Sequence, residues 1–99
     1  PLNDGDKIKI GDEYLEVLSV PGHSPGSVAL YCPSEGFVIS GDALFQGSIG
    51  RTDLPGGSQK VLVDAIRRKL FSLPDSTVVI PGHGPETTIA NEKRFNPYL

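Results

Sequence analysis

The sequence is poor in several kinds of residue, and each shortage excludes a class of protein. A single cysteine, Cys32, excludes an internal disulfide and suits a reducing compartment such as the cytoplasm. Nine Lys and Arg residues against 12 Asp and Glu give a net charge of −3, which is unlike a surface that binds nucleic acid or anionic lipid. No apolar run approaches the ~20 residues of a membrane-spanning helix. We therefore expect a cytoplasmic protein that contacts neither nucleic acid nor a membrane.

Methionine is also absent, and the chain opens with Pro1 although translation begins with Met. Removal of the initiator or trimming is one explanation, and origin as part of a longer polypeptide is the other. Only 37% of the 99 residues are hydrophobic, and a chain of this length encloses a limited core. We expect a single unit without internal repeats that forms part of a longer polypeptide.

The apolar pattern of the first part of the chain predicts a β-sheet. Short runs rich in β-formers are bounded by Gly, Asp and Pro turns, which is typical of antiparallel strands. The four predicted strands are residues 7–10, 13–20, 27–32 and 37–40. We expect these four segments to pair in one sheet.

The second part of the chain predicts a loop, a helix, a strand and a helix. Residues 41–57 are glycine-rich, and a loop of this length within a compact domain is usually functional or mobile. Ser58 is a candidate N-cap for a helix with apolar residues at helical spacing, which Pro74 ends. Residues 77–80 form a short buried strand, and a last helix starts near residue 87 or 88 and ends before Pro97.

The two histidines of the chain occur in similar local sequences. His23 and His83 each follow a β-rich run and lie in a Pro/Gly loop, and Asp42 directly follows the buried run 37–40. A carboxylate there is costly to bury unless it is paired, hydrogen-bonded or bound to metal. Imidazole and carboxylate together suit Zn, Fe or Mn. Each residue could equally serve as a turn former, so the spacing alone leaves a metal site as a hypothesis.

Other candidate residues give weaker signals. Arg51 lies in the glycine-rich loop, where a cation could meet an anionic substrate or simply face solvent. Ser24 and Ser27 lie near His23, but the Gly-x-Ser-x-Gly elbow of many serine hydrolases is absent. Cys32 lies in a predicted strand and is interpreted as a small core or edge residue rather than a nucleophile.

Five segments resemble the second half of the metallo-β-lactamase fold superfamily, and most closely its glyoxalase II-like hydrolases. Three of them are similar to the family's last three metal-binding motifs, and two to its later loop and its ending. In order along the chain, the five are Pro21–Ser27, Ser40–Phe45, Gly50–Asp53, Pro81–Gly84 and Glu92–Leu99. The resemblance covers essentially all 99 residues.

The resemblance implies an α/β (α+β) fold that is half of an αββα sandwich. Residues 1–99 would form the carboxy-terminal half of the domain, as a fragment of a longer chain, with one mixed sheet and helices on one face. The other face of the sheet would lack its covering layer, and monomers rarely expose so large an apolar patch. We therefore expect a homo-oligomer, or a dimer with exchanged elements, formed through that face.

The resemblance also implies a reaction and a role for four residues. The matching residues of the family make His23 a ligand of a first metal, Asp42 a catalytic residue that bridges two metals, and His83 a ligand of the second. The metals would be two zinc ions, with iron or manganese as alternatives. A metal-bound hydroxide would hydrolyse a small-molecule thioester such as an acyl-glutathione, and Arg51 would bind the substrate.

The family's main signature, His-x-His-x-Asp-His, is missing from this chain. The resemblance implies that the parent protein is a hydroxyacylglutathione hydrolase-like enzyme. Because the missing signature supplies four ligands, we expect the fragment alone to bind metal weakly or not at all and to be inactive. Two alternatives remain open. One is a persulfide dioxygenase-like enzyme with a single iron, in which His23 and Asp42 but not His83 are ligands. The other is a non-catalytic, self-associating domain.

Overall fold

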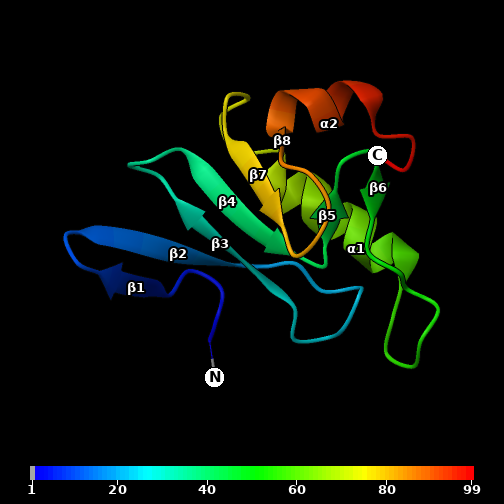
Figure 1. Cartoon of the computed structure of the whole chain (residues 1–99). Coiled ribbons are helices and arrows are strands. Elements are labelled where there is room, and N and C mark those ends of the chain that lie inside the picture. The colour runs from blue at the N-terminus through cyan, green and yellow to red at the C-terminus, as the bar shows by residue number, and fades with distance from the viewer. Residues whose placement is uncertain (1) are drawn as a thin grey trace.

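The computed structural model describes residues 2–99 and contains one six-stranded sheet, a separate two-stranded hairpin and helices on one face of the sheet (Figure 1). The sheet consists of β1 (Lys7–Ile10), β2 (Glu13–Ser19), β3 (Val28–Cys32), β4 (Phe37–Gly41), β7 (Val78–Pro81) and β8 (Thr87–Thr88). The hairpin consists of β5 (Leu44–Phe45) and β6 (Ser48–Ile49). The helices are α1 (Gln59–Ala65), its π-helical continuation η1 (Ile66–Leu70) and α2 (Ile89–Phe95). The predicted fold class, one mixed sheet with helices on one face, is confirmed.

The strand order explains how distant segments meet at one edge of the sheet. The order is β1-β2-β3-β4-β7-β8, and every neighbouring pair is antiparallel except β4 and β7, which are parallel. Strands β2, β4 and β7 therefore run in the same direction. Their carboxyl ends lie at the same edge, so the loops that follow them are brought together there.

The core lies between the sheet and the helices. Val38 and Val79 are directly paired across the parallel strands β4 and β7, and both are fully buried. From the other side, Leu62, Ile66 and Leu70 of α1 and η1 pack onto this face, as helical spacing predicts. This contact fixes the sheet relative to the start of α1.

Both helices begin at a side-chain cap, of which the one at Ser58 was predicted. The Oγ atom of Ser58 accepts a hydrogen bond from Val61 N at 3.3 Å, and the Oγ1 atom of Thr88 accepts one from Asn91 N at 3.1 Å. The long helix was predicted to continue to Pro74, but it ends in η1. The Phe71 N–H there bonds the Ile66 carbonyl at 2.9 Å, which is the wider spacing of a π-helix.

The sheet face opposite the helices carries apolar side chains that are only partly covered. Cross-strand pairing places Leu30, Ile39 and Ile80 in one row on this face, and all three are half-buried. Cys32 also lies on this side, outside the core under the helices, but it is buried and forms no disulfide. Within residues 2–99 no helix has both the length and the apolar character needed to cross a bilayer.

Candidate metal centre

The loops after β2, β4 and β7 bring His23, Asp42 and His83 together. The Nε2 atom of His23 lies 3.8 Å from Oδ2 of Asp42, and Nδ1 of His83 lies 3.8 Å from Oδ1 of the same carboxylate. Both separations are too long for a hydrogen bond. Each carboxylate oxygen faces a different imidazole, and a gap remains between the carboxylate and each ring.

His23 is held in one orientation by the backbone of the glycine-rich loop. Its Nδ1 lies 2.8 Å from the carbonyl oxygen of Arg51. A carbonyl only accepts hydrogen bonds, so Nδ1 carries the proton and the lone pair of the neutral ring is on Nε2, which faces Asp42. A backbone carbonyl is one of the partners that commonly hold the far nitrogen of a metal-binding imidazole and so orient its ring.

Asp42 is placed by a tight turn at the end of β4. Gly41 has a φ of 55°, a conformation that favours glycine, and the chain turns back so that Ala43 N bonds the Ser40 carbonyl at 3.0 Å. The buried Ser40 hydroxyl donates to the Leu44 carbonyl at 2.8 Å. Together these contacts direct the Asp42 carboxylate out of the edge of the sheet, where its side chain is 53% exposed.

His83 is the most exposed member of the group, with a side-chain exposure of 77%. Its ring packs against Phe45 of the hairpin, and the two ring centroids are 4.9 Å apart. The role of Phe45 could not be predicted from the residues, because a single aromatic residue in a glycine-rich segment gives no periodic signal.

The donor chemistry fits a transition metal ion, but the set is not complete. Two donors that bind one zinc ion at about 2.0–2.2 Å lie no more than about 4.4 Å apart, and both imidazole–carboxylate separations are within that limit. Among residues 2–99, however, no three His, Cys, Asp or Glu side chains form a set that could hold a metal ion unaided. An ion here would need further ligands.

Arg51 borders the same site but is already paired. Together with His23, Asp42 and His83 it lines a hollow of about 290 Å³. Its Nε and Nη2 atoms donate to the two carboxylate oxygens of Asp53 at 2.9 and 3.1 Å. This pairing raises the pKa of Arg51 and lowers the pKa of Asp53. An anionic substrate would therefore share the guanidinium with Asp53.

A buried carboxylate and the polar cluster around it were not predicted. Glu92 of α2 is fully buried and accepts hydrogen bonds from Gly47 N, Thr87, Asn91 and Asn96. Burial raises the pKa of Glu92, but the hydrogen bonds outweigh it and hold this pKa below its usual value. In the sequence, Glu92 precedes Lys93 and Arg94, so it resembles an ordinary surface residue of a charged helix.

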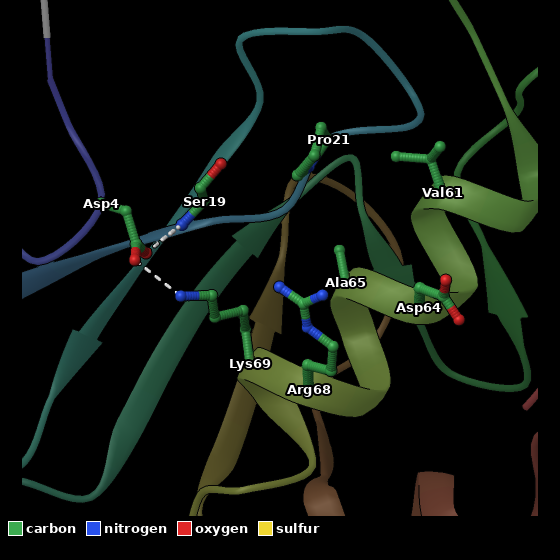
Figure 2. A pocket seen from close by; sticks show the side chains of 8 residues that line it. All are labelled: Asp4, Ser19, Pro21, Val61, Asp64, Ala65, Arg68 and Lys69. Carbon is green, nitrogen blue, oxygen red and sulfur yellow. Dashed lines mark hydrogen bonds and ion pairs between the residues drawn. The ribbon is translucent and has the colours of Figure 1, made fainter.

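A second cavity, of about 430 Å³, lies beside α1 and is less suited to catalysis (Figure 2). Lys69 Nζ pairs with Asp4 at 2.6 Å, and Asp4 also accepts from Ser19 N. The remaining charged residues of its lining, Asp64 and Arg68, balance each other, so the cavity has no net charge and contains no imidazole. The cluster around Asp42 is therefore the better candidate site.

Comparison with known proteins agrees with this choice. Residues 1–83 match the family described as the metallo-beta-lactamase superfamily. The probable metallo-hydrolase YqgX of Bacillus subtilis (strain 168) is 54% identical over 99 residues, which are 99% of this chain and 47% of the relative. The hydroxyacylglutathione hydrolase GloC of Haemophilus influenzae is 44% identical over 96 residues, 97% of this chain and 45% of the relative.

The likeness extends to solved structures. The crystal structure of TTHA1623 in a di-iron-bound form matches with a TM-score of 0.88 and 50% identity, over 100% of this chain and 48% of that chain. The chain thus spans about half the length of the relatives that it matches. Because the superfamily match extends over most of the sequence, the chain belongs to the metallo-β-lactamase superfamily.

Proposed function

We propose that the protein carrying this chain is a metal-dependent hydrolase that cleaves a small-molecule thioester such as an acyl-glutathione. The observation that carries the proposal is the Asp42 carboxylate, whose two oxygens each face a different imidazole at 3.8 Å. The names of YqgX, a probable metallo-hydrolase, and GloC, a hydroxyacylglutathione hydrolase, support the reaction type and the substrate class.

In this proposal three side chains hold metal and a fourth binds substrate. Nε2 of His23 and Nδ1 of His83 would each hold one ion, and Asp42 would bridge the two ions. When bound, the metal supplies hydroxide at neutral pH and polarises the carbonyl of the thioester. The Arg51 carbonyl keeps His23 in the productive tautomer, while the Arg51 guanidinium, which it would share with Asp53, would bind an anionic group of the substrate.

Two zinc ions are the proposed metals, and iron remains an alternative because TTHA1623 was solved in a di-iron-bound form. Both metals accept the imidazole and carboxylate ligands present here. The missing ligands would come from the rest of a longer protein, of which residues 1–99 are proposed to be the carboxy-terminal half. The 99-residue chain alone is expected to bind metal weakly or not at all and to be inactive.

The direct test uses the full-length protein, loaded in separate samples with zinc or iron. We expect release of free thiol from an S-acyl-glutathione, and two metal ions per chain by elemental analysis. The oxygenase alternative predicts oxygen consumption with a glutathione persulfide, one iron per chain and no thioester cleavage. That combination of results would replace the hydrolase proposal with the oxygenase.

A second proposal concerns the half-buried sheet face, which favours self-association of the 99-residue chain. Replacing Ile39 by lysine places a charge in the middle of the apolar row and is expected to convert a dimer or larger species into a monomer. Sedimentation velocity at micromolar concentration measures this. The control is Ile10→Lys, because Ile10 is already 56% exposed on the edge strand β1. A folded, monomeric wild-type chain would contradict self-association.

A further inference from the structure

Glu92 is a buried carboxylate that the proposed chemistry does not use. Both of its oxygens are occupied: Oε1 accepts from Gly47 N and Asn96 Nδ2, each at 2.9 Å, and Oε2 accepts from Thr87 Oγ1 at 2.7 Å and Asn91 Nδ2 at 3.1 Å. Burial of a carboxylate is tolerated only when it is hydrogen-bonded in this way. Such a group makes the segments that it joins rigid.

The segment that Glu92 joins to α2 is the hairpin β5–β6. The backbone N–H of Gly47, in the turn of the hairpin, donates to Glu92, and the carbonyl of the following residue, Ser48, accepts from Asn96 Nδ2 at 3.0 Å. One backbone donor and one backbone acceptor of the hairpin are thus fixed by two side chains of the carboxy-terminal segment. Asn96 also accepts from Tyr98 N at 3.0 Å, which holds the chain end in the same cluster.

The hairpin in turn carries the groups that hold both histidines. Its first strand provides Phe45, whose ring lies 4.9 Å from that of His83. Its second strand leads through Gly50, which donates to the Ala43 carbonyl at 3.0 Å, to Arg51. The Arg51 carbonyl accepts the Nδ1 proton of His23. A continuous path of hydrogen bonds and a short length of backbone therefore connects Glu92 with His23.

We propose that Glu92 and Asn96 are positioning residues, which lock the hairpin and thereby fix the tautomer of His23 and the packing of His83. The importance of this role for metal binding rests on the proposed function, but the tautomer itself does not. The tautomer of His23 can therefore be measured in the metal-free protein, and the result does not depend on hydrolase activity.

The test replaces Glu92 by alanine and by glutamine. Glutamine keeps one acceptor for Gly47 N and Asn96 and turns its amide toward the Thr87 hydroxyl, which can accept. The hydrogen bond from Asn91 Nδ2 is lost, but Asn91 does not contact the hairpin, so Glu92→Gln should retain the wild-type tautomer of His23. Glu92→Ala removes the acceptor altogether. Hydrogen exchange at the Gly47 amide should then accelerate at least about tenfold.

The decisive measurement is two-bond nitrogen–proton NMR of the His23 ring at pH 8, where a free imidazole is neutral. Wild type and Glu92→Gln should show one tautomer with the proton on Nδ1. Glu92→Ala should lose that single tautomer and show a mixture. Asn91→Ala is the matched control, because Asn91 bonds Glu92 and Thr87 but not the hairpin, so it should lower stability and leave the tautomer unchanged.

If Glu92→Ala does not fold, Asn96→Ala provides the same test, since it releases the Ser48 carbonyl while Glu92 still holds Gly47. A smaller but measurable loss of the Nδ1 tautomer is then expected. A His23 ring that keeps its single tautomer in a folded Glu92→Ala or Asn96→Ala protein would overturn the inference. The same result in Asn91→Ala as in Glu92→Ala would also overturn it, because general destabilisation would then be the cause.

Discussion

Substitution of Asp42 by asparagine is expected to abolish thioester hydrolysis and to weaken metal binding by at least about 100-fold in the full-length protein. The amide has the same shape as the carboxylate but carries no charge and has only one acceptor oxygen. It can therefore serve one of the two imidazole-facing positions, not both. Loss of a group that merely supports a ligand typically costs 10–100-fold, so loss of a bridging ligand should exceed this. Calorimetric metal titration and turnover measure the two effects.

Asp53→Asn is the matched control for this prediction. Asp53 is exposed, lies in the same loop region and pairs with Arg51 rather than with an imidazole. Its substitution should leave metal content unchanged and alter only the KM for an anionic substrate. Because both aspartates are exposed, neither variant should shift the melting temperature much. Wild-type metal affinity in Asp42→Asn would show that the carboxylate is not a ligand.

The convergence of His23, Asp42 and His83 could be predicted because each of the three follows a strand. Runs rich in β-formers or in apolar residues mark β2, β4 and β7 in the sequence, and a residue that follows a strand lies at an edge of the sheet. The structure confirms that the three side chains lie close together. Their binding of metal stays a prediction, as does the assignment of residues 1–99 to the carboxy-terminal half of a domain.

The strand order and the hairpin could not be predicted from the sequence pattern. Insertion of β7 between β4 and β8 is a non-local pairing, which no local period specifies. Strands of two residues, such as β5 and β6, are too short to show alternation. The sequence therefore predicts an irregular loop over residues 41–57, although the hairpin in it places Phe45 against the ring of His83.

The buried cluster was missed for a different reason. Glu92 lies in a short helix beside two cations, and a charged helix is usually interpreted as a solvent-exposed face. Its burial depends on donors that are distant in the sequence, above all the Gly47 amide. Sequence reasoning finds side chains with distinctive chemistry at strand ends more readily than the residues that hold them in place.

Gly50→Ala is expected to destabilise the protein by about 2–3 kcal/mol and to disrupt the site at the same time. A Cβ atom at residue 50 would overlap the carbonyl oxygen of Asp42 and lie 3.3 Å from the Cβ of His23. The backbone of the glycine-rich loop must therefore move away from both residues, and the Arg51 carbonyl moves with it. For a domain of this size the melting temperature should fall by roughly 10–20 °C, which differential scanning calorimetry measures.

Gly26→Ala separates this steric effect from the general cost of replacing a glycine. A Cβ atom at residue 26 meets nothing within 4 Å, and Gly26 does not have a positive φ. The alanine there should change stability by no more than about 0.5 kcal/mol, or stabilise slightly by restricting the unfolded chain. Equal melting temperatures for the two variants would show that the loop is free to shift at Gly50. The Arg51 carbonyl would then not be held rigidly against His23, and the close packing of this loop against Asp42 would have no part in shaping the site.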